Sequence, residues 1–170
     1  MGTVTAVSDD ALADLIADLT QRGLTMATAE SLTGGGLVAR LVDVPGASHV
    51  VRGGACTYAV DTKASVLGVS ESQLALTGPV DEQVARQMAR GARELFHADI
   101  GVSTTGVAGP GPADGFPAGT VHIACAHPAG EEHRLLHLDG DRAAVRAGAI
   151  DAAIALVRDV LDFAGAQAGD

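Results

Sequence analysis

The sequence predicts an α/β fold: a three-layer α/β/α sandwich around a mixed, mostly parallel sheet with a C-terminal antiparallel hairpin. Three observations lead to this prediction. Apolar runs typical of buried strands alternate with segments whose apolar residues recur at helical spacing. Apolar residues make up 47% of the chain and 22 residues are glycine, which suits small side chains at close helix–sheet contacts. The last two strand-like runs are joined by a turn at residues 128–130, as in a hairpin.

The first elements predicted are a helix, a strand, a second helix and a second strand. Ser8 is suited to cap a helix that ends before Gly23. An apolar strand follows at residues 24–29, a helix at 34–44 and a second strand at 54–59. The apolar face of the first helix is predicted to consist of Leu12, Leu15, Ile16 and Leu19.

Two short helices are predicted next. Asp61 is the expected cap of a helix that contains Lys63 and ends at Gly68. Residues 70–73 match a capping box, so a second short helix begins there.

The remaining elements are a long helix from Asp81, three strands and a last helix from 141 to about 163. The strands are predicted at residues 100–104, 120–126 and 133–138. The inward face of the long helix is predicted to consist of Val84, Met88, Ala92 and Leu95. That of the last helix is predicted to consist of Val145, Ala149, Ala152, Leu156 and Val160.

Composition limits the classes of function. With 170 residues, 1–170 is expected to be a single domain. The net charge of −10 argues against binding to nucleic acid or an anionic membrane surface, and 2% aromatic residues leave little for stacking on bases. The two cysteines fit free thiols in a reducing compartment. No apolar run reaches the roughly 18 residues of a membrane span, and the N-terminus lacks a signal-peptide pattern. We therefore expect a soluble, cytoplasmic protein.

The stretch at residues 26–36 is the first candidate site. A strand leads into Glu30, Ser31 and Thr33, then three glycines open a helix. This geometry directs backbone N–H groups at whatever lies in the turn. A tight turn capped by Ser or Thr explains the same residues. A second glycine-rich turn follows the strand at 100–104, and the two turns line one crevice if their strands are near neighbours.

The absence of several motifs narrows the chemistry. The sequence has no phosphate-loop motif, no dinucleotide fingerprint after the first strand and no Gly-x-Ser-x-Gly elbow. His133 and His137 are about 13 Å apart along one strand face, too far to share a metal ion. All six histidines are interpreted as solvated or structural.

Among nucleophilic mechanisms, the one that remains is attack by a serine that a lysine or tyrosine activates. The chain has few lysines, and Lys63 follows Tyr58 closely. A surface lysine and a half-buried strand tyrosine are the simpler alternatives.

Three motifs in this order resemble the C-terminal domain of competence/damage-inducible protein A (CinA). The resemblance covers about residues 9–162, expected to be the ordered core. Its motifs are residues 27–35 with Glu-Ser-x-Thr-Gly-Gly, Thr57-Tyr58 with Lys63, and Thr105-Gly106-Val107-Ala108-Gly109-Pro110. Residues 119–121 and 140–142 also match.

The resemblance implies an amidohydrolase that converts nicotinamide mononucleotide to nicotinate mononucleotide and ammonia in pyridine-nucleotide salvage. Neither a metal nor an organic cofactor is expected. The implied catalytic residues are Ser31, Lys63 and Tyr58. The expected substrate-binding residues are Glu30, Thr33, Gly34, Gly35, Thr105, Gly106, Gly109 and Arg142.

Amide hydrolysis needs a nucleophile, a proton acceptor and donors for the oxyanion. In our hypothesis Ser31 attacks the carboxamide, Lys63 accepts its proton, and Tyr58 relays or orients. Backbone N–H groups of residues 33–35 would hold the oxyanion. Whether Ser31 is a covalent nucleophile or positions a water stays open.

The sequence departs from the family in three places. Val60 stands where a polar residue is usual, residues 112–113 interrupt a glycine run, and residues 116–118 lack a basic residue. Arg142 or Arg52 is a candidate source of the missing phosphate charge. The alternative function is a nucleotide-binding regulatory module without turnover. A DNA-uptake or repair role fits the charge poorly. Alanine-rich helix faces and the resemblance make a homodimer plausible.

Overall fold

The computed structural model describes residues 4–167, and a five-stranded sheet forms its centre. Its elements are α1 (Asp9–Arg22), β1 (Met26–Glu30), α2 (Gly36–Val42), the 3₁₀ helix η1 (Ala47–His49), β2 (Val51–Cys56), α3 (Val60–Leu67), α4 (Glu71–Thr77), α5 (Glu82–Phe96), β3 (Ile100–Gly106), β4 (Thr120–His127), β5 (Gly130–His137) and α6 (Arg142–Gln167). None of the helices in these residues is long and apolar enough to cross a membrane.

The strand order is β2-β1-β3-β4-β5. β1 pairs in parallel with both β2 and β3, whereas β4 is antiparallel to both β3 and β5. All strands except β4 therefore run in one direction. The predicted mixed, mostly parallel sheet with a C-terminal antiparallel hairpin is confirmed.

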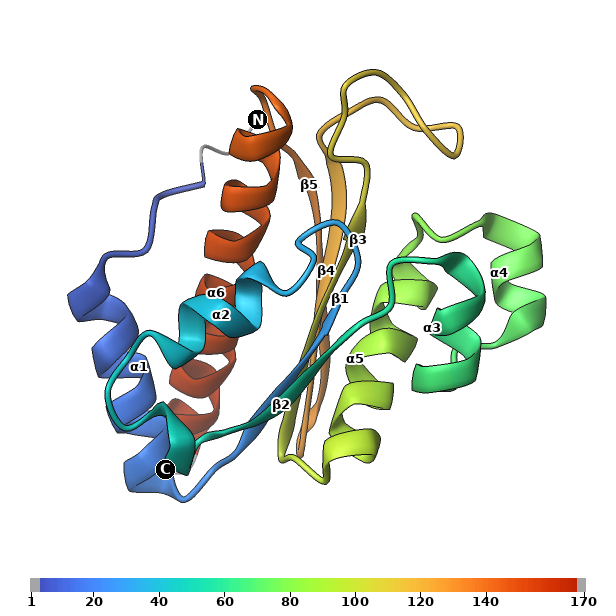
Figure 1. Ribbon diagram of the computed structural model, residues 1–170. Coiled ribbons are helices and arrows are strands. Elements are labelled where there is room, and N and C mark those ends of the chain that lie inside the picture. The colour runs from blue at the N-terminus through green and yellow to red at the C-terminus, as the bar shows by residue number, and fades with distance from the viewer. Residues whose placement is uncertain (1–3, 168–170) are drawn as a thin grey trace.

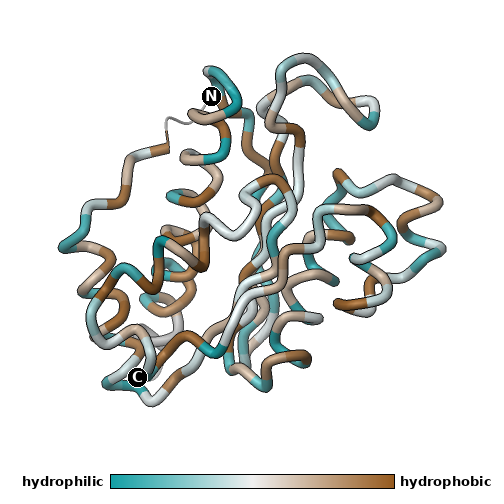
Figure 2. The backbone as a smooth tube through the Cα atoms, in the orientation of Figure 1, coloured by the Kyte–Doolittle hydropathy of each residue, from teal (hydrophilic) through white to brown (hydrophobic). Residues whose placement is uncertain are grey.

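Helices cover both faces of this sheet (Figure 1). α1, α2 and α6 pack on one face around the larger apolar cluster, which includes Leu15, Leu37 and Val157. α3, α4 and α5 lie on the other face, where Met88 of α5 packs with Ala27 of β1. Hydrophobic segments occur in the helices of both layers (Figure 2). The α/β/α layering follows from these two apolar faces.

Local capping signals locate most helix ends. The Ser8 side chain accepts a hydrogen bond from the N–H of Ala11, and the α1 helix ends at Gly23 in the left-handed region. The Ser70 side chain caps α4 and that of Asp81 caps α5. The predicted Asp61 cap is wrong: Ala59 is the N-cap of α3 and forms no side-chain cap bond, so Asp61 lies inside the first turn, where its charge still suits the helix dipole.

The predicted inward faces of the helices hold with one exception. Those of α1 and α6 are buried as predicted. In α5, however, Leu95 is 45% exposed. The buried stripe advances in steps of four through Val84, Met88 and Ala92, and the next step is Phe96. A Cβ at Gly53 of β2 would lie 2.6 Å from the Phe96 ring, so Phe96 packs against the sheet where Leu95 was expected.

The register of the sheet positions the site. Glu30, at the end of β1, is opposite Cys56 of β2 and Thr104 of β3. The turns after β1, β2 and β3 therefore emerge side by side at one edge, where α/β sheets commonly bind ligands. The two glycine-rich turns noted in the sequence are neighbours.

Candidate active site

The Glu30 carboxylate accepts hydrogen bonds from the glycine-rich turn that follows it. Glu30 is fully buried, and its carboxylate accepts hydrogen bonds from the Thr33 hydroxyl at 2.7 Å and from the N–H groups of Gly35, Leu37 and Val38 at 2.8–3.0 Å. These N–H groups belong to the start of α2, so the carboxylate meets the positive end of the helix dipole. Glu30 and Thr33 were predicted to bind substrate, but the structure directs their side chains into the protein.

Some backbone N–H groups of this turn donate to acceptors within the protein, and others have no acceptor. The Gly34 N–H donates to the Ser31 carbonyl and the Gly35 N–H to Glu30. These two expected oxyanion donors are therefore already occupied. Within residues 4–167, the N–H groups of Leu32 and Thr33 have no acceptor, although both residues are buried. Buried N–H groups almost always find a partner. Leu32 lines the cavity next to Ser31 and Thr33 does not, so the free N–H of Leu32 marks a place for an acceptor.

Ser31 and Lys63 meet across the gap between β1 and α3. The Lys63 ammonium lies 3.0 Å from Ser31 Oγ and also donates to the Thr57 carbonyl. Lys63 is fully buried. Burial lowers its pKa to about 8, while the negative charge of Asp114 acts in the opposite direction. A lysine of this kind can accept a proton from a serine at neutral pH.

Tyr58 takes a different position from the one expected for a proton relay. It is 62% exposed, and its hydroxyl accepts a hydrogen bond from Arg142 at 2.9 Å. The same guanidinium donates to the Gly109 carbonyl at 2.6 Å. Arg142 thus links the segment after β2 to the glycine-proline loop after β3. Tyr58 borders the site without a hydrogen bond to Lys63 or Ser31 among the described residues.

These groups line a cavity of about 250 Å³. Its lining includes Ser31, Lys63, Tyr58, Arg142, Gly106 and Gly109. Thr105 also borders it, but its hydroxyl donates to the Pro79 carbonyl at 2.7 Å and so fastens the segment before α5. The predicted residues Glu30, Thr33, Gly34 and Gly35 lie behind this surface. The structure therefore brings together a serine hydroxyl, a buried amine and the free backbone N–H of Leu32.

The family model for the CinA C-terminal domain matches residues 9–161. The chain belongs to the CinA family. It is 48% identical over 155 residues to a CinA-like protein from Frankia casuarinae, and 43% identical over 143 residues to a putative competence-damage inducible protein from Desulforamulus reducens. These matches cover 91% and 84% of the chain but 36% and 35% of the relatives, so the chain spans about a third of the length of these curated relatives.

Solved CinA-family structures have the same fold. The competence/damage inducible protein CihA from Agrobacterium tumefaciens superposes with a TM-score of 0.86 at 34% identity, covering 94% of this chain and 98% of that one. A CinA superfamily protein from Escherichia coli gives 0.86 at 32% identity, covering 93% and 95%. Both structures correspond to nearly the whole of the present chain.

Two of the three departures from the CinA pattern fall on the cavity wall, whereas residues 116–118 are not among its lining residues. Val60 is 43% exposed and lines the cavity at the start of α3, where a polar residue was expected. Pro112 and Ala113 line it from the loop after β3. The substitutions therefore change the surface that meets a ligand and leave the Ser31–Lys63 pair intact.

Arg146 is a residue of the site that sequence analysis missed. Its Nε donates to the Leu32 carbonyl at 3.0 Å and its Nη2 to the Thr33 carbonyl at 2.9 Å. The available sequence signal was its spacing from Arg142, because residues four apart share one face of a helix. Arg52, the other candidate for phosphate, donates to the Phe96 carbonyl at the opposite end of β2 and lies outside the cavity lining.

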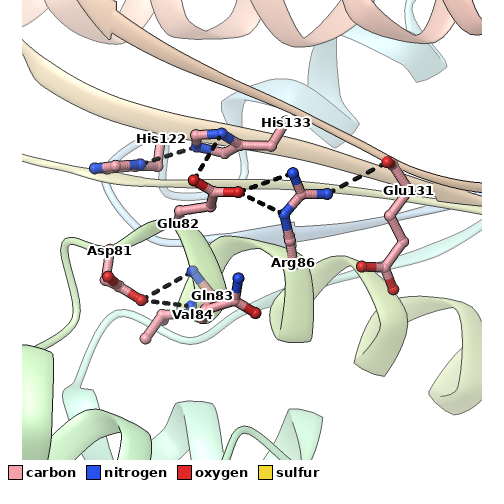
Figure 3. A network of polar contacts seen from close by, with 8 residues as sticks. All are labelled: Asp81, Glu82, Gln83, Val84, Arg86, His122, Glu131 and His133. Atoms are coloured by element: carbon pink, nitrogen blue, oxygen red, sulfur yellow. Dashed lines mark hydrogen bonds and ion pairs between the residues drawn. The ribbon is translucent and has the colours of Figure 1, made fainter.

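Two histidines form a pair that the sequence pattern had concealed. His122 Nδ1 and His133 Nε2 are 2.9 Å apart across β4 and β5, and the rings stack (Figure 3). His133 also lies 3.7 Å from the Glu82 carboxylate, which pairs with Arg86. Burial is the main cause that lowers the pKa of both histidines. Within residues 4–167 no group of three or more His, Cys, Asp or Glu residues could hold a metal ion.

Proposed function

We propose that this protein hydrolyses the carboxamide of nicotinamide mononucleotide to give nicotinate mononucleotide and ammonia. The observation that supports this most strongly is the 3.0 Å contact between Ser31 Oγ and the buried amine of Lys63. Membership of the CinA family supports the choice of substrate. The homodimer, the cytoplasmic location and the single domain at residues 1–170 stay predictions from the sequence.

The reaction begins with neutral Lys63. It accepts the proton of Ser31 as Oγ attacks the carboxamide carbon, and a tetrahedral oxyanion forms. The free N–H group of Leu32, which lines the cavity, stabilises the oxyanion in place of those of Gly34 and Gly35. Lys63 then gives its proton to the departing nitrogen, so ammonia leaves and an acyl ester of Ser31 remains.

Water completes the cycle. Lys63, neutral again, accepts a proton from a water molecule that attacks the ester carbonyl, and the Ser31 hydroxyl is restored. The balance is one amide and one water consumed, with one carboxylic acid and one ammonia formed. Arg142 and Tyr58, which border the cavity, contact the nucleotide beyond its ring, and the Gly106–Gly109 backbone lets it approach the loop closely.

The decisive experiment is ammonia release from nicotinamide mononucleotide, with nicotinate mononucleotide identified by chromatography. Ser31→Ala is expected to lose more than about 10³ in rate, because even one oxyanion donor commonly contributes 10²–10³. The matched control is Ser65→Ala, an exposed serine of α3 two residues from Lys63. Nucleotide binding without ammonia release would favour the regulatory module. Near-normal turnover by Ser31→Ala would refute the covalent route and leave Ser31 to position water.

A further inference from the structure

We propose that Asp114 is a specificity-determining residue that selects ligands in which the ring bearing the carboxamide carries a positive charge. This inference rests on the proposed function, because it names the feature of the substrate that the cavity of that reaction recognises. The ligand class is N-alkylated pyridine carboxamides, whose ring is a pyridinium cation, in preference to carboxamides on a neutral ring. Asp114 lines the same cavity as Ser31 and Lys63.

A tight turn in the loop between β3 and β4 holds Asp114. This loop extends past the end of the sheet, toward the side covered by α3 and α4 (Figure 1). Backbone hydrogen bonds of 2.9 and 3.0 Å join Ala113 and Phe116 in both directions. The φ angles of Asp114 and Gly115 are 52° and 83°, as in a two-residue type I′ turn. Asp-Gly and Asn-Gly both suit such a turn, so the turn alone does not require a charge at Asp114.

Asp114 is the one acidic residue among the described residues that line the cavity. The other charged residues of the lining are Lys63 and Arg142. Within residues 4–167, the Asp114 carboxylate lies within 4.0 Å of no Lys, Arg or His nitrogen. Lys63 is neutral at the start of the proposed reaction. The cavity then presents one negative and one positive side chain, and the negative one has no ion-pair partner.

The charge of Asp114 acts at the reacting end of the cavity. Burial is the larger influence on the pKa of Lys63 and lowers it, whereas the charge of Asp114 raises it. Ser31 Oγ lies 3.0 Å from the Lys63 amine, so the carboxamide must lie there as well. In nicotinamide mononucleotide, one ring carbon separates the cationic nitrogen from the carbon that bears the carboxamide. A carboxamide placed for attack therefore brings the ring charge into the field of Asp114.

A neutral ring in the same place would not compensate the carboxylate. Such a ring removes water from Asp114 and offers no charge in return, which costs free energy. A cationic ring offsets that cost by Coulomb attraction. Arg142, which donates to the Tyr58 hydroxyl and the Gly109 carbonyl, supplies the opposite charge for the phosphate of the nucleotide. The charges of the cavity thus match a ligand with a positive ring and a negative tail.

The test measures affinity by calorimetry in a Ser31→Ala background, which prevents turnover. The probes are nicotinamide mononucleotide, whose ring is cationic, and its 1,4-dihydro form, whose ring is neutral. Asp114→Asn removes the charge and keeps a residue that suits the turn, and a thermal melt checks the fold. The matched control is Asp14→Asn, at an exposed acid of α1 outside the cavity lining.

We expect Asp114→Asn to weaken binding of the cationic probe about fivefold, the upper end for an exposed ion pair. Binding of the neutral probe should stay within about twofold, and Asp14→Asn should change neither affinity. The comparison of two probes on each variant separates the ring charge from a change in cavity shape. An equal loss for both probes, no loss, or no binding of either probe would overturn the role of Asp114.

Ammonia release distinguishes failure of this inference from failure of the proposed function. If the wild-type protein leaves nicotinamide mononucleotide intact while the preference for the cationic probe depends on Asp114, the proposed function fails and the assigned ligand class stands. If the wild-type protein releases ammonia and Asp114→Asn keeps both affinities, the proposed function stands and the role of Asp114 is refuted.

Discussion

The pKa of the Lys63 amine, on which the proposed reaction depends, can be measured directly from the signal of its ε-carbon. Lys63 is the one lysine in the sequence, so selective ¹³C labelling of lysine gives a single ε-carbon signal. Its titration should report a pKa of about 8, below the ordinary value of 10.5, because the side chain is buried. The measurement needs neither substrate nor an assumed reaction.

The lowered pKa has a calculable effect on the supply of base. At pH 7 a lysine with a pKa of about 8 is neutral in about 9% of molecules, against about 0.04% for a solvated lysine. Burial thus raises the fraction of active base about 200-fold. We expect kcat/KM to rise about tenfold per pH unit below that pKa and to level off above it.

The assay is ammonia release across pH 6–10, with the ¹³C titration measured alongside. Lys63→Met should abolish the rising limb and lower the rate by at least about 10², the usual size of a general-base contribution. A flat profile from pH 6 to 9 would refute the reasoning. So would an ε-carbon that titrates near 10.5, since a solvated amine is a poor base at neutral pH.

Two further predictions concern charges that act at a distance. Asp114→Asn removes a charge that raises the pKa of Lys63, so the rising limb should move to lower pH; movement to higher pH would contradict the assigned sign. Burial lowers the pKa of His122 and His133 in the native state below the 6.5 of the unfolded chain, so the unfolded chain binds more protons and the free energy of unfolding should fall as pH drops from 7 to 5. Urea unfolding should show that the free energy of unfolding of His133→Gln falls less over this pH range than that of the wild type, with a difference of up to about 1.4 kcal/mol per pH unit for one proton. Equal falls in the two proteins would show that His133 does not contribute to the pH dependence.

Structural features that depend on residues close in the sequence, such as helix starts, were predictable. Those that depend on how the strands pair were less predictable. Ser8 and Asp81 identify helix starts because capping depends on residues three or four positions apart. Leu95 was misplaced because three- and four-residue steps fit the same helical pattern, and the space left by Gly53 decides between them. His122 and His133 come into contact through pairing of β4 with β5, which fixes diagonal neighbours that spacing along one strand does not reveal.

The residues of the candidate site also fall into those that the sequence predicted and those that it did not. The Ser31 turn and Lys63 were predicted, since the polar residues follow strands and the chemistry needs a base. The direction of the Glu30 carboxylate was not, because the same residue type can bind a ligand or cap the following helix. Arg146 lies more than a hundred residues from Leu32 and Thr33, so its contact depends on how α6 crosses the sheet.

The buried Glu30 carboxylate has a consequence for how this protein could change its substrate. It already occupies the positive end of α2, so the nucleophile turn has no charge to offer a phosphate. Under the proposed function, selectivity for the rest of the ligand would therefore depend on the cavity rim, which includes Val60, Pro112 and Arg142. Under the proposed function the Ser31 turn and these rim residues belong to different segments, which leaves the rim free to diversify while the turn is kept.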